Sequence, residues 1–200
     1  MTDDWSFDPA LPRCWWSGAT AERPDPAMVR YHDVEWGTPC HDDIELFERL
    51  LLEWFQAGLS WSTILHKRDG FRAAFRGFDP RVVAAFGDAD RERLMADAGI
   101  VRNRAKVDAT IGNARAWLQL AAEHGSADAY FLTMVPDAGR RLDPSVEGGG
   151  IPDRTSVSDA LSNDLRRRGF KFVGSTIMYA FMQSVGLVDD HLATCFRYRG

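Results

Sequence analysis

The stretch VGSTIMYAFMQSVGLVDD, residues 173–190, carries the clearest structural signal in the chain. It is apolar on nearly every side, and a helix with no polar face is buried in a protein core. No segment of the chain shows convincing strand alternation. We therefore expect an all-α protein whose helices pack around this segment.

Helical patterns extend outward from this segment over most of the chain. They predict helices over 42–56, a helical stretch over 59–78, two short helices within 79–100, a long helix over 102–125 and a capped helix over 156–170. Gly70 and Gly77 are the expected breaks in the stretch 59–78, and Gly125 is the expected end of the long helix. Asp79 before Pro80 is a typical helix start. Residues 136–155 are rich in Pro, Gly and Asp and are expected to be irregular.

Size and composition suit one soluble domain. The chain has 200 residues, of which 45% are hydrophobic and 26% charged, with a net charge of −5. We expect a loose leader over residues 1–13 and a single domain of two helical lobes over 14–200. No run is apolar enough for a membrane span and the start lacks signal-peptide features, so we expect a cytoplasmic protein that does not bind membranes.

Four potential metal ligands lie near the two ends of the chain. Cys14 and His32 form one pair, and His191 and Cys195 form a second pair spaced by one helical turn. Two thiolates and two imidazoles suit a closed tetrahedral Zn²⁺ site, which would be structural because it leaves no position for water. Spacing alone leaves open that both cysteines are merely buried small residues.

Tryptophan is abundant, and several copies lie beside polar groups. Glu53 falls in the most apolar helix of the N-terminal half, where a carboxylate must be paired, hydrogen-bonded or used. A partly exposed helix glutamate is the alternative interpretation. The tryptophans are individually as consistent with a core as with a ligand site. The sequence QAGLSW, residues 56–61, predicts a tight turn with Leu59 at its tip.

The sequence LMADAGIVRNRAKVDATI, residues 94–111, has the layout of a helix-hairpin-helix, a motif that we place at about 90–118. Gly99 lies at the turn, and Arg102, Arg104 and Lys106 lie at the start of the second helix. Free N–H groups at such a turn favour a phosphate of a nucleic acid backbone. A plain turn between two helices is the alternative. A second basic run, RRRGFKF at 166–172, is also consistent with a solvated helix end.

Together these segments resemble the DNA-3-methyladenine glycosylase I family of the helix-hairpin-helix superfamily. The resemblance runs from about Cys14 to Cys195. It is carried by the motifs RCWW, YHDVEWGTP, FQAGLSWSTILHKR, AGIVRNRAKVDATIGNARA, LRRRGFKFVG and YAFMQSVGLVDDH. It implies a helix-hairpin-helix glycosylase fold in which one structural Zn²⁺ joins the two ends of the chain through the four ligands named above.

The resemblance also implies a pocket for the damaged base, between the two lobes. Glu53 matches the acidic residue that hydrogen-bonds the base, and we take it as the candidate catalytic residue, with recognition as its main role. Trp61 matches the residue on which the base stacks, beside Tyr31. Trp16 and Trp36 match further aromatic residues of the pocket. Leu59 matches the residue inserted into the gap in the DNA stack.

The implied activity is hydrolysis of 3-methyladenine from alkylated double-stranded DNA, leaving an abasic site, by a monomeric and monofunctional enzyme of base excision repair. Two alternatives are a zinc-containing module that binds damaged DNA without catalysis and a glycosylase for another alkylated base. Two positions depart from the family pattern. Trp54 replaces a small residue and would alter base preference if it faced the pocket, and Asp189 replaces an asparagine near His191.

Overall fold

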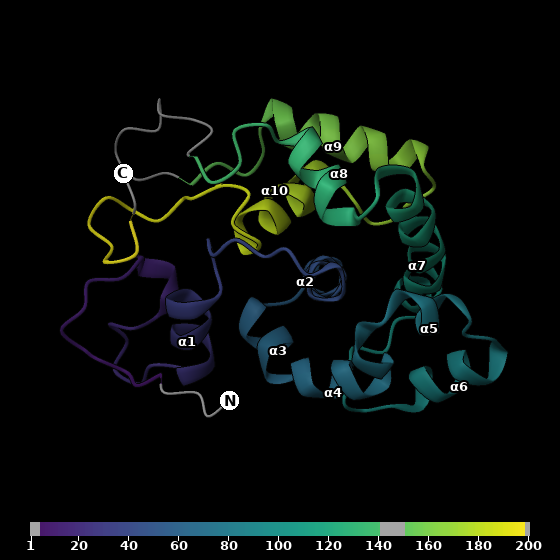
Figure 1. Cartoon of the computed structure of the whole chain (residues 1–200). Coiled ribbons are helices and arrows are strands. Elements are labelled where there is room, and N and C mark those ends of the chain that lie inside the picture. The colour runs from purple at the N-terminus through teal and green to yellow at the C-terminus, as the bar shows by residue number, and fades with distance from the viewer. Residues whose placement is uncertain (1–4, 141–150, 199–200) are drawn as a thin grey trace.

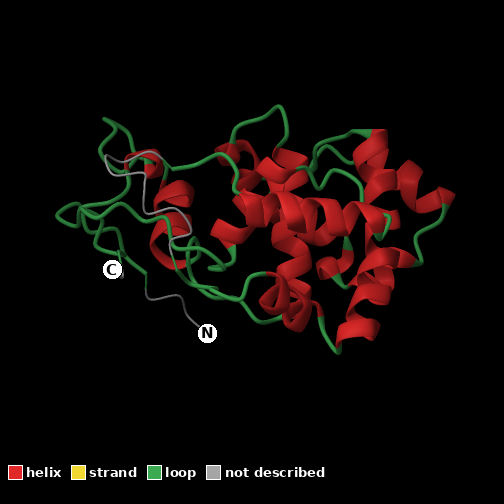
Figure 2. Ribbon diagram, turned by 90° about the horizontal axis from the view of Figure 1, so that it is seen from above, coloured by secondary structure: helices red, strands yellow, loops and turns green. Residues whose placement is uncertain are grey.

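The computed structural model describes residues 5–140 and 151–198, and the regular structure within these ranges is helical throughout (Figure 2). The predicted all-α class is therefore confirmed. The expected irregular segment 136–155 lies partly outside the described residues. In chain order the elements are η1 (Trp15–Ser17), α1 (Pro26–Val34), α2 (Asp43–Gln56), α3 (Trp61–His66), α4 (Arg68–Ala74), η2 (Arg76–Phe78), α5 (Pro80–Ala84), α6 (Asp88–Ala96), α7 (Arg104–His124), α8 (Ala127–Met134), α9 (Ser156–Arg167) and α10 (Ser175–Ser184).

Helix α2 occupies the centre of the molecule, where Figure 1 shows it end-on with the other helices around it. Its residues 46–55 are all buried, including Glu48 and Arg49. Helix α10 is largely buried against α2 and α9, but the expectation that the helices surround the 173–190 segment was wrong. The central position of α2 was not evident from the sequence because Glu48 and Arg49 are charged. Apart from Glu45, the partners that allow their burial lie far along the chain, among them Arg68 and the Ser184 carbonyl.

Most helix ends follow the local signals. The Asp79 side chain accepts a hydrogen bond from the Arg81 N–H at the start of α5, and Pro80 is the first helical residue. The long helix α7 ends before Gly125, which adopts φ +89°. The helix expected from residue 156 is α9, with Thr155 as its cap. These expectations are confirmed.

One predicted break was wrong. Gly77 does interrupt the chain, with φ +67°, but Gly70 lies inside α4. A Cβ atom at Gly70 would lie 2.5 Å from the carbonyl oxygen of Gly99. Gly70 is therefore required for close packing between α4 and the turn after α6, and it does not end a helix.

The two ends of the chain lie on the same side of the molecule. Figure 1 shows the N-terminal segment and α1 next to the C-terminal segment that follows α10. Trp5 and Arg13 both donate hydrogen bonds to Asp33 in α1. Whether residues 1–13 form a separate leader stays a prediction. Within the described residues, no helix is both long and apolar enough to cross a membrane.

Candidate functional site

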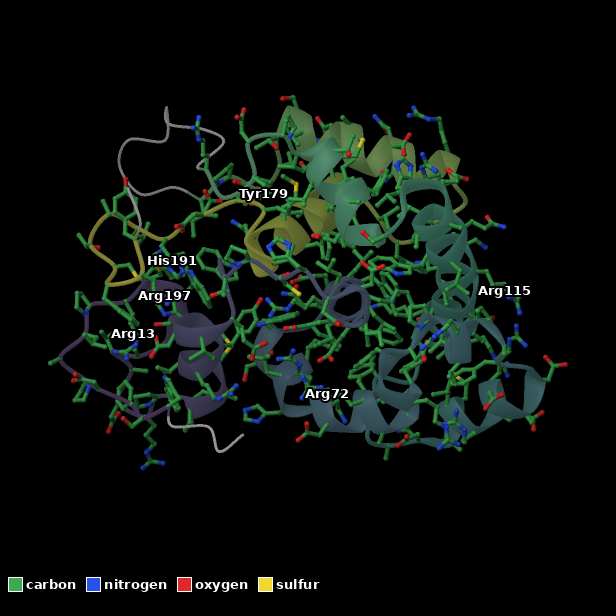
Figure 3. All side chains as sticks on the ribbon, viewed as in Figure 1. Arg13, Arg72, Arg115, Tyr179, His191 and Arg197 are labelled. Carbon is green, nitrogen blue, oxygen red and sulfur yellow. The ribbon has the colours of Figure 1, made fainter. Side chains whose placement is uncertain are left out.

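The four predicted metal ligands meet where the chain ends converge. The Cys14 Sγ lies 3.6 Å from His191 Nδ1, and the Cys195 Sγ lies 3.4 Å from His32 Nε2 and 3.5 Å from His191 Nδ1. All four side chains are buried, and their ligand atoms lie within 4.8 Å of one another. We refer to these four residues as the Cys/His cluster. Figure 3 shows His191 on this side of the molecule, near Arg13 and Arg197.

The geometry of the Cys/His cluster fits a metal ion. Zn–N bonds of about 2.0 Å and Zn–S bonds of about 2.3 Å in a tetrahedron place ligand atoms about 3.4–3.8 Å apart. The remaining ring nitrogens of the two histidines have partners. His32 Nδ1 lies 2.9 Å from Asp33 Oδ1, and His191 Nε2 lies 3.1 Å from the Trp36 carbonyl oxygen. Such contacts orient metal-binding imidazoles, so the cluster could hold a metal ion.

The electrostatics of the cluster also favour a cation. Burial raises the pKa of the Cys14 thiol to about 12, and burial lowers the pKa of His32. A neutral imidazole is the form that binds metal, whereas a thiolate here requires a nearby positive charge. The Asp33 carboxylate behind His32 is held in turn by Arg13, which lowers the pKa of Asp33 despite the opposing effect of burial.

A second feature, which we call the aromatic pocket, lies next to the cluster. Its volume is about 310 Å³, within the range of small-molecule sites. The five side chains predicted to bind a base are all in its wall: Trp16, Tyr31, Trp36, Glu53 and Trp61. Six further residues line it that the sequence did not reveal: Trp15, Met28, Gln56, Ile151, Ala180 and Gln183.

Among the described residues that line the pocket, Glu53 is the one with a carboxylate. The residue is only 5% exposed, and no hydrogen bond from the described residues reaches its side chain. Burial raises its pKa to about 8, with Arg49 one turn earlier in α2 acting in the opposite direction. The interpretation of Glu53 as a partly exposed helix residue was therefore wrong. A buried carboxylate facing a cavity without a partner is suited to a ligand that donates hydrogen bonds or carries positive charge.

The aromatic rings surround this carboxylate. Tyr31 and Trp61 have ring centroids 5.1 Å apart, and Trp16 and Trp36 have centroids 4.8 Å apart in an edge-to-face arrangement. The indole N–H groups of Trp16 and Trp61 are buried and have no hydrogen-bond partner within the described residues. The pocket thus combines ring faces with unused polar groups, which suits a flat, polar, cationic ligand.

Of the six lining residues that were missed, four lie within motifs quoted for the family resemblance: Trp15, Gln56, Ala180 and Gln183. Gln56 is the first residue of the QAGLSW turn, and Trp15 follows Cys14 directly. Trp15 is 72% exposed and lies at the edge of the pocket. Gln183 comes from α10, where its side chain donates to Asp190. Nothing in the sequence alone relates Gln183 to Glu53, because only the packing of α10 on α2 brings them together.

The residues expected to contact DNA divide into two groups. Leu59 is 42% exposed on the turn after α2, and Arg102 and Arg104 are exposed beside the turn that contains Gly99. Lys106 is 7% exposed, and its ammonium donates to backbone carbonyls at the end of α2. Two of its three ammonium protons thus point into the protein, which disfavours the phosphate contact expected for Lys106.

The two departures from the family pattern also have clear positions. Trp54 is fully buried and packs edge-to-face on Phe47, outside the wall of the aromatic pocket. It therefore contributes to the core and does not reshape the pocket. The Asp189 carboxylate is buried and accepts a hydrogen bond from the backbone N–H of His191, so the residue is not a surface charge.

Comparison with known proteins agrees with this arrangement. The sequence pattern of the methyladenine glycosylase family matches residues 20–198. The chain belongs to this family. DNA-3-methyladenine glycosylase 1 of Escherichia coli K12 is 47% identical over 190 residues, which cover 95% of this chain and 98% of the relative.

Two further methyladenine glycosylases extend the comparison. The DNA-3-methyladenine glycosylase of Haemophilus influenzae is 42% identical and covers 92% of this chain and 96% of its own length. The solved structure of 3-methyladenine DNA glycosylase I from Staphylococcus aureus, described for its recognition of 3-methyladenine, superposes with a TM-score of 0.84. It is 32% identical and covers 96% of this chain and 98% of its own.

Proposed function

We propose that this methyladenine glycosylase hydrolyses the N-glycosidic bond of 3-methyladenine in alkylated double-stranded DNA and leaves an abasic site. The observation that carries the proposal is the buried Glu53 carboxylate, which has no hydrogen-bond partner among the described residues and faces a pocket of aromatic rings. The activity named for the relatives from E. coli and H. influenzae supports the same reaction.

The chemistry of the substrate matches this site. Methylation at N3 makes the adenine cationic in DNA, which weakens the glycosidic bond and improves the base as a leaving group. Ring faces attract such a cation, and a nearby positive charge stabilises the ionised form of Glu53. Unmodified adenine lacks the charge and gains less from the same contacts. Glu53 then acts chiefly by recognition and electrostatic stabilisation, while water attacks a bond that is already labile.

The base must leave the DNA stack before it can enter the pocket. Leu59 lies on an exposed turn between Glu53 and Trp61, which suits insertion into the gap left by the extruded base. We assign α6, the turn at Gly99 and α7 as the helix-hairpin-helix, with Arg102 and Arg104 as phosphate contacts. The Gly99 N–H donates to the Asp97 side chain, so Gly99 would contribute to DNA binding through the shape of the turn and not through this N–H.

For the Cys/His cluster we propose one structural Zn²⁺. Two thiolates and two imidazoles are ligands that zinc prefers, and the four residues leave no position for water. All three cysteines are free thiols, which is consistent with the reducing cytoplasm. We expect the enzyme to act there as a monomer, since one chain supplies both the aromatic pocket and the Leu59 side chain that would enter the gap in the DNA stack.

The test is base release from methylated duplex DNA, with 3-methyladenine, 3-methylguanine and 7-methylguanine separated by chromatography. Predominant release of 3-methyladenine supports the proposal. Release of chiefly another base would replace it with a glycosylase of different preference. Absence of release by folded, metal-loaded protein that still binds the DNA would leave a damage-binding module as the function.

A further inference from the structure

The Lys106 side chain is buried, with only 7% of the residue exposed to solvent. It lies in the first turn of α7, and its Nζ donates hydrogen bonds of 3.0 Å to the Phe55 carbonyl and 2.9 Å to the Ala57 carbonyl. The ammonium also lies 5.9 Å from the centroid of the Phe55 ring. A buried ammonium is stable only with such partners, so its position is closely determined.

The two carbonyls belong to the end of α2. The last carbonyls of a helix have no N–H partner within the helix and carry partial negative charge, so a cation there is favourable. Directly after them Gly58 adopts φ +86°, and the Leu59 N–H donates to the Gln56 carbonyl at 2.6 Å. Lys106 therefore fixes the backbone from which the exposed Leu59 side chain projects.

The same lysine belongs to the candidate DNA-binding turn. Its own N–H donates to Asn103 Oδ1, which caps α7. On the other side of the turn, Lys67 Nζ donates to the Ala98 carbonyl at 2.9 Å. Lys106 is thus the residue through which the start of α7 holds the turn between Glu53 and Trp61.

We propose that Lys106 is a positioning residue that fixes the turn at Leu59 relative to the helix-hairpin-helix. DNA bound at the helix-hairpin-helix then meets both the Leu59 side chain and the aromatic pocket in the correct alignment. This rests on the proposed function. The exposed Arg102 and Arg104 remain available for phosphates, whereas Lys106 donates two of its three ammonium protons within the protein. Burial also lowers the pKa of Lys106, as expected for a desolvated ammonium.

A double-mutant cycle tests this role. We expect Lys106→Met to lower kcat/KM for 3-methyladenine release from duplex DNA about tenfold, since small displacements of positioning groups have effects of this order. In a Leu59→Ala background the same change should lower it less than about threefold, because coupled residues are not additive. Additive effects in the two backgrounds would overturn the proposal.

Salt dependence separates positioning from phosphate binding. Arg104→Met should reduce the slope of log affinity against log salt concentration by about one, whereas Lys106→Met should leave that slope unchanged. An equal reduction by both variants would show that Lys106 contacts DNA phosphate. Free 3-methyladenine should bind Lys106→Met within about threefold of its wild-type affinity, whereas general damage to the pocket would abolish this binding.

Amide hydrogen exchange measures the positioning without any reaction. Exchange at the Leu59 N–H should accelerate about tenfold in Lys106→Met, and unchanged exchange would overturn the proposal. If Lys106→Met does not fold, Lys106→Gln, which keeps donors but removes the charge, replaces it in each measurement. The wild-type protein is measured as the reference. If it released no base, the proposed function would be rejected. The hydrogen-exchange result would still decide whether Lys106 positions the turn at Leu59.

Discussion

The Cys/His cluster and the aromatic pocket are neighbours that both take residues from α1, yet their polar groups face different surroundings. In the cluster, the nitrogen and sulfur atoms point at one another across less than 4.8 Å. In the pocket, the Glu53 carboxylate lines a space of about 310 Å³, and the indole N–H groups of two wall tryptophans have no hydrogen-bond partner within the described residues. Both sets of groups are buried, but only those of the pocket can be reached by a ligand larger than an ion.

This difference separates structural from recognition chemistry. A closed set of four ligands can stabilise the fold through one ion but cannot admit a substrate. A buried carboxylate without a partner destabilises the free protein and gains a partner only when the ligand arrives. Substitutions in the Cys/His cluster should therefore mainly lower the stability of the protein, and substitutions in the aromatic pocket should mainly lower its activity.

The largest expected effect is the loss of a cluster ligand. Cys14→Ala should lower the free energy of unfolding by on the order of 5 kcal/mol and abolish stoichiometric metal binding, because metal binding contributes to folding. Cys40→Ala is the matched control, since Cys40 is also a buried free thiol but lies outside the cluster. Urea unfolding and metal analysis measure both. Equal destabilisation by the two variants, with metal content unchanged, would remove the distinction between the sites.

Glu53→Gln should have the next largest effect, and on activity. We expect 3-methyladenine release to fall about 100-fold, which corresponds to about 2.7 kcal/mol, because the amide cannot balance the charge of the base. Single-turnover base release from methylated duplex DNA provides the measurement. Glu92→Gln, on the exposed part of α6, is the control and should retain wild-type rates. A wild-type rate in Glu53→Gln would show that the carboxylate is not used.

The same substitution should raise stability in a pH-dependent way. Burial raises the pKa of Glu53 from 4.5 to about 8, so the folded protein keeps a proton that the unfolded chain releases between these values. Wild-type stability is therefore lost as pH rises through this window. We expect Glu53→Gln to exceed the wild type by on the order of 4 kcal/mol at pH 8 and to match it at pH 4. Urea unfolding at both pH values measures the difference in the free energy of unfolding between the variant and the wild type. The same difference at pH 4 and pH 8 would contradict the prediction.

The smallest effect that we predict concerns the aromatic wall. Trp61→Ala should lower base release about tenfold, in line with the 1–3 kcal/mol or so that base stacking contributes. Trp54→Phe serves as the comparison because Trp54, near the end of α2, is buried in the core and does not line the pocket. It should reduce stability and leave the ratio of released bases unchanged. A changed ratio in Trp54→Phe would mean that the core position shapes the pocket after all.

Local signals were sufficient for much of the fold. Asp79 and Gly125 mark helix ends in the sequence because caps depend on a few neighbouring residues. The helix break predicted at Gly70 was wrong for the opposite reason. The role of Gly70 depends on Gly99, which approaches it only in the folded chain. Helix α8 (Ala127–Met134) was not predicted at all. Its first residues are fixed by Asp43, which lies far away in the sequence and accepts hydrogen bonds from their N–H groups.

The site divides in the same way. The wall residues predicted from the family resemblance line one pocket, but their burial could not be deduced from composition. Glu53 is as hydrophilic in sequence as any exposed helix glutamate, and only the packing around α2 excludes water from it. Lys106 was assigned to DNA because basic residues at a helix start usually face solvent. Its true neighbours, the carbonyls of Phe55 and Ala57, come from another helix and carry no sequence signal.

The long separation between the two halves of the cluster has a consequence during protein synthesis. Cys14 and His191 are 177 residues apart, and Cys195 follows later still. A ribosome must translate past residue 195 before the cluster can assemble, and closing so long a loop is slow. The pocket wall at Trp16 and Trp36 is anchored beside this cluster, so nascent chains lack a finished base pocket. We therefore expect recognition of damage to be acquired in the last stage of folding.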